Sequence, residues 1–141
     1  LTMCWAVRFI HNSEDRQSRF ERGGAKLPVA TRGGAQVLLV PWGRRPREPG
    51  LLPVGGWAKL THIQAGLWDK FQPRPVKLPV MAFAERDVTG REQWFEVTGG
   101  QYIQGCGVTI ENERRVYVVT LDCSPEEAEF ERWPRIVSAI G

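Results

Sequence analysis

The second half of the chain is a succession of short apolar runs separated by turn sequences, and this pattern limits the possible folds more than any other feature. Four runs rich in Val, Ile, Phe, Tyr and Trp are typical of strands. They cover residues 75–85, 93–97, 101–110 and 114–122. The segments between them, such as Asp-Val-Thr-Gly-Arg-Glu and Thr-Gly-Gly, are good turn sequences. Consecutive strands joined by short turns predict a mostly antiparallel sheet.

The first half of the chain predicts further strands and one irregular loop. We expect a strand at about residues 4–10 and a hairpin over 27–43 with an Arg-Gly-Gly turn. The polar segment 11–26 between them is predicted to be a loop or a short amphipathic helix. Residues 44–56 hold three prolines and three glycines. Regular structure is therefore not expected there, and a loop of this length in a compact domain is often functional.

Two segments carry helix signals. Residues 61–72 begin with Thr61 as the expected N-cap and end before Pro73. Residues 124–133 begin with Ser124 as N-cap, followed by proline and a capping-box glutamate. Together these patterns predict an α+β fold, with a mostly antiparallel β sheet or barrel-like core and two or three short helices.

Length and charge bound the class of protein. At 141 residues the chain has the size of one domain, and we expect a single domain over 1–141. Residues 1–60 carry a net charge of +6 and residues 61–141 a net charge of −3. A basic half that also holds tryptophans suits a nucleic-acid partner, because phosphates attract Lys and Arg while unstacked bases lie on aromatic rings. An ordinary solvated surface fits the same charge.

Other classes of site and location are disfavoured. No run approaches the ~20 apolar residues of a membrane helix, and charges interrupt the start of the chain where a signal peptide would need an apolar segment. We therefore expect no membrane partner and a cytoplasmic location. The cysteines Cys4, Cys106 and Cys123 are widely spaced, which disfavours a zinc site or a disulfide framework. Packing is the expected role of Cys106 and Cys123.

A few polar residues could carry chemistry. Glu85 ends an apolar strand, and alternation places it near the core, where burial raises the pKa of a carboxyl group toward neutral pH. An ion pair in solvent with Arg86 or another arginine is the alternative. His62, beside the expected helix cap, could act as a general acid or contact a phosphate, although such a histidine is more often simply exposed. Trp42, Trp57 and Trp68 could stack on a base but could equally be core residues.

The order of these pieces along the chain is more informative than any one of them. Met3-Cys4 opens the first strand, a later strand ends in Trp42-Gly43, and an apolar strand ends in Glu85. Between and after them come Gly-Leu-Leu-Pro, Gly-Gly-Trp-Ala-Lys, Val-Tyr-Val-Val-Thr and a closing Arg-Trp-Pro. This order resembles the SOS response-associated peptidase (SRAP) family. Its members carry Met-Cys-Gly-Arg-Phe, Trp-Gly-Leu-Ile-Pro, Asn-Ala-Arg-Ala-Glu-Thr, Gly-Phe-Tyr-Glu-Trp and His-x-Arg-Met-Pro. The chain would be a short, divergent member of the kind found near phage genes.

The resemblance implies a function in the DNA damage response. It implies a β-rich α+β fold around a positively charged cleft for single-stranded DNA, and a nucleoid-associated protein. Removal of Met3 would leave Cys4 at the chain terminus, where its amine and thiol form a thiazolidine with the ring-opened aldehyde of an abasic site. Glu85 would transfer protons during imine formation. No cofactor or metal is implied.

The resemblance also implies which residues contact DNA. Trp42 and Gly43 match the Trp-Gly that lines the family's cleft. Arg8 lies two residues beyond the place of the family's first arginine, which Ala6 occupies. Further candidates come from the aligned positions of the other two motifs: His62 for the family's Asn, Gln64 for its Arg, and Arg132 for the closing Arg.

Departures from the family pattern leave alternatives open. Phe130 stands where the family has its closing histidine, and with Leu1 and Thr2 attached Cys4 has no free amine. One alternative is therefore a non-catalytic single-stranded DNA-binding relative. Another is a cysteine-dependent peptidase or hydrolase that uses Cys4 with His62. A third is a β-rich structural protein with no DNA partner.

Overall fold

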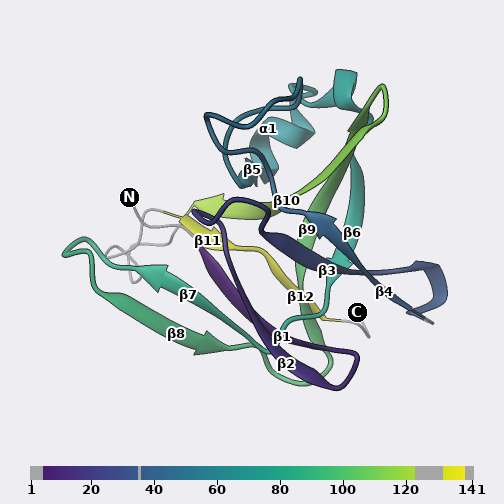
Figure 1. Cartoon of the computed structure of the whole chain (residues 1–141). Coiled ribbons are helices and arrows are strands. Elements are labelled where there is room, and N and C mark those ends of the chain that lie inside the picture. The colour runs from purple at the N-terminus through teal and green to yellow at the C-terminus, as the bar shows by residue number, and fades with distance from the viewer. Residues whose placement is uncertain (1–4, 35, 123–131, 139–141) are drawn as a thin grey trace.

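The computed structural model describes residues 5–34, 36–122 and 132–138. Within these ranges the protein is mostly β, with mostly antiparallel sheets, one short α-helix and two 3₁₀ turns (Figure 1). The strands are β1 (Ala6–His11), β2 (Glu14–Arg19), β3 (Lys26–Ala30), β4 (Val37–Pro41), β5 (Trp57–Lys59), β6 (Arg74–Leu78), β7 (Ala82–Arg86), β8 (Glu92–Glu96), β9 (Gln101–Ile110), β10 (Glu113–Asp122), β11 (Arg132–Pro134) and β12 (Ile136–Ser138). The helix α1 is Leu60–Gln64, and the 3₁₀ turns are η1 (Arg32–Gly34) and η2 (Asp69–Phe71).

The strands form three sheets. An antiparallel sheet of four strands has the order β2-β1-β7-β8, so the first strand of the chain lies between its hairpin partner and β7. A larger sheet is built on the long hairpin β9–β10, to which β6, β11 and β12 add antiparallel and β5 adds parallel. The hairpin β3–β4 is separate. No sheet of the described residues closes on itself, so the expected barrel-like core is not observed.

The core has two parts, one on each face of the β9–β10 hairpin. Val116 and Val118 of β10 point into one cluster, which includes side chains of β1, β3, β4 and β7. Tyr117 and Val119 point into the other, with Trp68 and Phe71. Since successive side chains of a strand face opposite sides, a strand buried on both faces needs a continuous apolar run. The run in β10 meets this requirement.

The first half contains a hairpin that the sequence did not predict. Residues 11–26 were predicted to form a loop or a short helix, but Glu14–Arg19 forms strand β2, which pairs with β1. Asn12 and Ser13 at the turn both have positive φ (52° and 65°). A turn with two left-handed residues matches the twist of the flanking strands, which explains the tight connection. The side chains of β2 are polar on both faces, so its sequence shows no alternation of apolar and polar residues.

The predicted strand 75–85 is two strands in two sheets. The chain leaves β6 after Leu78 and starts β7 at Ala82, on the other side of Pro79. Proline has no N–H to donate to a ladder, so a sheet strand ends there easily. The remaining predictions for this half, strands near 93–97, 101–110 and 114–122, are confirmed by β8, β9 and β10.

The predicted helices are shorter than expected. Over 61–72 only α1 and η2 form, with Gly66 between them at φ +84°. Thr61 lies inside α1, whose N-cap is Lys59 without a side-chain hydrogen bond, so the predicted cap is wrong. The predicted helix 124–133 lies mostly outside the described residues, and its last two residues belong to β11. In the part of the chain described here, no helix is long and apolar enough to cross a membrane.

Candidate active site

Glu85 is the most unusual polar residue of the described structure. It lies on β7, directly after three buried residues of that strand, and its side chain is fully buried (0% exposed). Neither carboxyl oxygen accepts a hydrogen bond from a described residue. An ionised carboxylate in such a place loses its hydration without compensation. The predicted burial of Glu85 is therefore confirmed, and the alternative of an ion pair in solvent is not observed.

Burial changes the protonation of Glu85. It raises the pKa of the carboxyl group from 4.5 to about 9. At neutral pH the group is therefore a neutral acid that holds a proton it can donate. An acid of this kind can protonate a leaving hydroxyl group. Its ionised form can then accept a proton from water.

The first described residues lie beside the strand that carries Glu85. Ala6 pairs with Ala84, and the backbone N–H of Trp5 donates to the carbonyl of Ala84 at 3.1 Å. Trp5 is the first described residue; Cys4 and Met3 lie outside the described residues.

Two arginines from different strands flank Trp5. The guanidinium groups of Arg19 and Arg86 lie 4.6 Å and 4.2 Å from the centre of the indole ring. Arg19 also pairs with Glu92 at 3.3 Å, and Arg86 with Glu21 at 3.6 Å. Sequence analysis missed this cluster, because its members come from β2, β7 and the start of β1 and show no pattern along the chain.

The closing segment of the chain packs against the same sheet. The ring of Trp133 on β11 lies 5.2 Å from the ring of Phe83 and 4.9 Å from that of Phe95. Phe83 is two residues before Glu85 on the same face of β7. Three segments that carry the family resemblance therefore meet: the opening strand, the strand ending in glutamate and the closing Arg-Trp-Pro.

Trp42 and Gly43 lie in the core rather than on a surface. Trp42 is fully buried, and its indole N–H donates to the carbonyl of Gly56 at 3.0 Å. Gly43 has φ +50°, and a Cβ atom there would lie 2.1 Å from the carbonyl oxygen of Gly55. Neither residue offers a side chain to DNA. Their contacts support a structural role in holding the loop 44–56.

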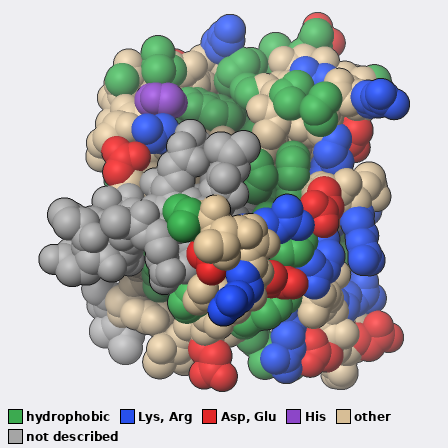
Figure 2. Space-filling view, turned by 90° about the vertical axis from the view of Figure 1, so that its left-hand side faces the viewer, with side chains coloured by type: hydrophobic (Ala, Val, Ile, Leu, Met, Phe, Trp, Pro, Cys, Tyr) green, Lys and Arg blue, Asp and Glu red, His purple; other side chains and the backbone are tan. Residues whose placement is uncertain are grey.

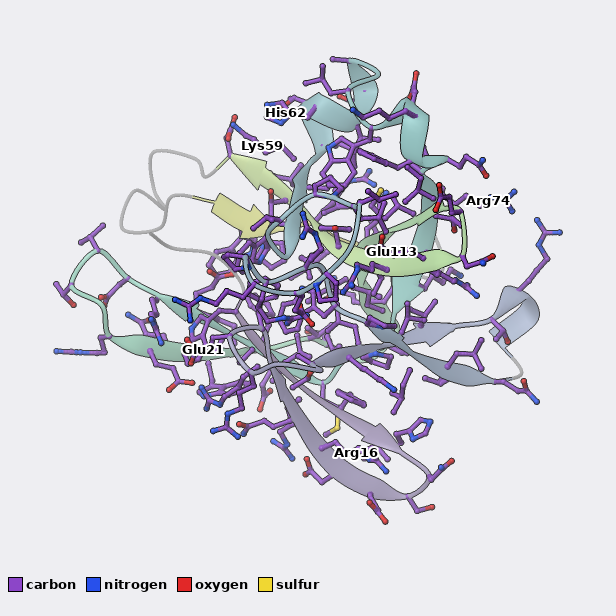
Figure 3. The ribbon with its side chains drawn as sticks, turned by 45° about the horizontal axis from the view of Figure 1, so that its top comes forward. Arg16, Glu21, Lys59, His62, Arg74 and Glu113 are labelled. Carbon is purple, nitrogen blue, oxygen red and sulfur yellow. The ribbon has the colours of Figure 1, made fainter. Side chains whose placement is uncertain are left out.

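His62 and Gln64 lie apart from Glu85. Both are exposed on α1. Figure 3 shows His62 next to Lys59 and well separated from Glu21, whose carboxylate pairs with the neighbour of Glu85, Arg86. The described structure therefore does not bring His62 and Glu85 together.

The two predicted DNA-binding arginines have different positions. Arg8 is exposed on β1 and holds the Asp15 carboxylate at 2.9 Å, so part of its charge is already neutralised. This ion pair raises the pKa of Arg8 and lowers that of Asp15. Arg132 begins β11, beside Trp133. Its backbone pairs with that of Asp122 on β10.

The remaining cysteine of the described residues has a packing role. Cys106 is buried in the core cluster with Tyr117 and Trp68, as predicted, and burial raises the pKa of its thiol to about 11. Cys123 lies outside the described residues. Among residues 5–34, 36–122 and 132–138, no group of three or more His, Cys, Asp or Glu side chains could hold a metal ion.

Comparison of the chain with protein-family models, with curated proteins and with solved structures finds no significant match.

Proposed function

We propose that this protein binds single-stranded DNA and covalently captures abasic sites through Cys4, in the manner of the SRAP family that its sequence resembles, and that its fold is SRAP-like. The observation that carries the proposal is Glu85, a buried and unpartnered carboxyl group on the strand beside the start of the chain. Burial of an ionisable group without a hydrogen-bond partner costs folding free energy, which makes such a group a candidate for a role in chemistry.

The capture reaction requires a chain that begins at Cys4, because an internal cysteine has no amine. The terminal amine attacks the aldehyde carbon of a ring-opened abasic site, and loss of one water gives an imine. The Cys4 sulfur then adds to the imine carbon while the thiol proton passes to the nitrogen, which closes the thiazolidine ring. The sequence of steps releases one water and needs no oxidant or reductant.

Glu85 assists the step in which water leaves. With a pKa of about 9 it is protonated at neutral pH and donates its proton to the departing hydroxyl group. The resulting carboxylate is poorly solvated in the buried site, so it readily takes a proton back.

The meeting of the three segments supports the same function. Trp133 of the closing segment packs on the sheet of Glu85, and Trp5 is held against that sheet by Ala84 and two arginines. The two arginines beside Trp5 each also pair with a glutamate, and they are cations that a phosphate-containing substrate could contact.

The experiment uses protein expressed from Met3, a single-stranded oligonucleotide with one abasic site, and the variant Cys4→Ala. We expect the wild type to form an adduct that survives denaturation without a reductant. Cys4→Ala retains a terminal amine, so it should form only an imine, which survives denaturation after borohydride reduction alone.

Two results would point elsewhere. Equal, reductant-independent adducts in both proteins would show that the Cys4 thiol is not the nucleophile. Binding of the oligonucleotide without any adduct would favour the non-catalytic DNA-binding alternative. The cysteine-dependent hydrolase alternative, which uses Cys4 with His62, stays a prediction, because Cys4 lies outside the described residues.

A further inference from the structure

The sheet β2-β1-β7-β8 has an outer face that lies opposite the core. Val7 of β1 and Phe83 of β7 belong to the core cluster. Successive side chains of a strand face opposite sides, so Arg8 and Ala82 point away from that cluster. Glu85 is two residues after Phe83 and therefore faces the core. A site on the outer face is separate from the acid that the capture reaction would use.

A pocket lies on this outer face. Arg8 of β1 pairs with Gln17 of β2 and with Ala82 of β7, and Ala82 in turn pairs with Glu96 of β8. Directly paired residues share a face, so these positions form a row across the sheet. Ala82 carries only a methyl group, which leaves the row hollow at its centre. The pocket has a volume of about 390 Å³ and is lined by Arg8, Gln17, Ala82, Trp94, Phe95 and Glu96. Small-ligand sites have volumes of about 300–1,000 Å³.

Trp94 gives the pocket an uncovered aromatic surface. It is two residues before Glu96, on the same face of β8, and it is 39% exposed. Each of the other five tryptophans stacks on a ring or a cation. Trp94 has no such partner among the described residues. Its indole ring is therefore available to the apolar face of a ligand.

Polar groups of fixed position stand beside the indole ring. Arg8 donates from Nε and Nη2 to the Asp15 carboxylate at 3.1 and 2.9 Å, which leaves its Nη1 without an acceptor in the described part of the chain. The hydrogen bond and the charge of Asp15, and then the charge of Glu96, raise the pKa of Arg8. Gln17 adds an amide that can both donate and accept. The pocket thus offers donors and acceptors next to an apolar surface.

The charge around the pocket disfavours a phosphate ligand. Arg8 is the one cation among the described residues of the lining, and the carboxylates of Asp15 and Glu96 outweigh it. Lys and Arg side chains also lie among Asp and Glu side chains over the lower right of the surface in Figure 2. A neutral ligand rich in hydroxyl groups avoids repulsion by the carboxylates. Its hydroxyl groups can donate to Glu96 and accept from Arg8, while the C–H face of a pyranose ring packs on the indole.

We propose that this pocket, formed by Arg8, Gln17, Ala82, Trp94 and Glu96, binds a pyranose unit of a neutral oligosaccharide. The proposal goes beyond the capture of abasic sites and does not depend on it.

The test is a titration of ¹⁵N-labelled protein with maltoheptaose, cellohexaose and the hexamer of N-acetylglucosamine, followed through the indole N–H signals. The spectrum of Trp94→Phe lacks the Trp94 signal and so identifies it. We expect at least one of the three oligosaccharides to shift that signal in a saturable manner. Trp94→Ala should weaken the binding about tenfold or more in calorimetry, and Trp94→Phe should weaken it less, because the smaller ring keeps part of the contact.

The matched control is Leu67→Ala, at a 62% exposed apolar position that follows α1 and does not line the pocket. It should bind like the wild type. Glu96→Gln should keep the affinity within about threefold, since its amide oxygen still accepts a hydrogen bond. An increase from about 50 to about 500 mM NaCl should leave the affinity unchanged, because a neutral ligand releases no counterions. Unchanged backbone N–H spectra would show that the variants fold.

Three results would overturn the saccharide site. The first is the absence of a shift with all three oligosaccharides. The second is displacement of the oligosaccharide by oligothymidylate together with an affinity that falls with salt, which would identify an anion site. The third is binding of tetramethylammonium in place of the oligosaccharide, lost in Glu96→Gln, which would identify a cation site.

The outcomes for the pocket and for the proposed function are separable. Trp94→Ala expressed from Met3 should form the abasic-site adduct at the wild-type rate. If no oligosaccharide binds while the adduct still forms, the pocket is wrong and the proposed function stands. If an oligosaccharide binds through Trp94 while no adduct forms, the pocket stands and the capture chemistry is wrong.

Discussion

Glu85 and Asp87 are two residues apart in the chain, and their environments are opposite. Glu85 is fully buried on β7 without a hydrogen bond from a described residue, and burial raises its pKa to about 9. Asp87 begins the β7–β8 turn and accepts hydrogen bonds from the Thr89 hydroxyl, the Gln93 amide, and the backbone N–H groups of Thr89 and Arg91. The Thr89 hydroxyl bond is the largest of the effects that lower the Asp87 pKa to about 2.

The two environments distinguish a carboxylate that stabilises the fold from a carboxyl group that is a candidate for chemistry. Asp87 is ionised, and its hydrogen bonds hold the turn together, as an Asx turn does. Glu85 is neutral and stabilises nothing that the described residues reveal. A costly residue without a structural role is a candidate for chemistry, whereas a fully satisfied one is not.

The largest expected effect is on capture. Glu85→Gln keeps the shape of the side chain but removes the acidic proton, so the rate of adduct formation at pH 7 should fall about 100-fold. Glu111→Gln, at an exposed turn far along the chain, is the control and should react like the wild type. Gel analysis of adduct formation over time gives both rates. Equal rates for the Glu85 variant and the wild type would contradict the assignment of Glu85 as the acid.

The next effect is on the pH dependence of stability. Between pH 4.5 and about 9 the folded protein holds the Glu85 proton while the unfolded chain has lost it. Unfolding therefore releases a proton, and the free energy of unfolding falls as the pH rises, by about 1.4 kcal/mol per pH unit from this group. Glu85→Gln removes this slope, so the variant should gain stability relative to the wild type between pH 5.5 and 8.5. Urea unfolding at several pH values measures the difference. A constant difference would mean that Glu85 is ionised in the fold.

A smaller effect of opposite sign is expected at Asp87. Its lowered pKa contributes stability above pH 3.8 that is lost as the pH falls toward 2. Asp87→Asn should therefore lower the thermal unfolding temperature by a few degrees at pH 7, and the gap to the wild type should narrow between pH 4 and pH 2. Adduct formation should keep its wild-type rate. A large loss of capture in this variant would blur the distinction between the two carboxyl groups.

Much of the sheet structure follows from the sequence, because its long strands are buried on at least one face. Residues 116–119 are a continuous apolar run that both core clusters require, and β9 and β10 lie where the pattern predicts them. Strand β2 was missed because it is a polar edge strand, whose two arginines, Arg16 and Arg19, are three residues apart and imitate a helix surface. Helix 61–72 was overestimated because Gly66 takes a left-handed conformation after the first turn.

Of the candidate site, the sequence predicted the buried residue Glu85 but not the residues around it. Alternation along β7 placed Glu85 toward the core, which is a local property. The Trp5 stack with Arg19 and Arg86 depends on the pairing of three strands, and pairing cannot be deduced from any one of them. Trp42 matched a DNA-lining motif, but its fully buried ring serves the core, which agrees with the common role of tryptophan in small domains.

The most direct measurement is the intact mass of protein expressed from Met3, before and after incubation with a single-stranded oligonucleotide carrying one abasic site. We expect a protein that lacks Met3 and a product whose mass equals protein plus oligonucleotide less one water. This product should persist without reductant only when Cys4 is present. A protein that retains Met3, or one that binds the oligonucleotide and keeps its own mass, would contradict capture through Cys4.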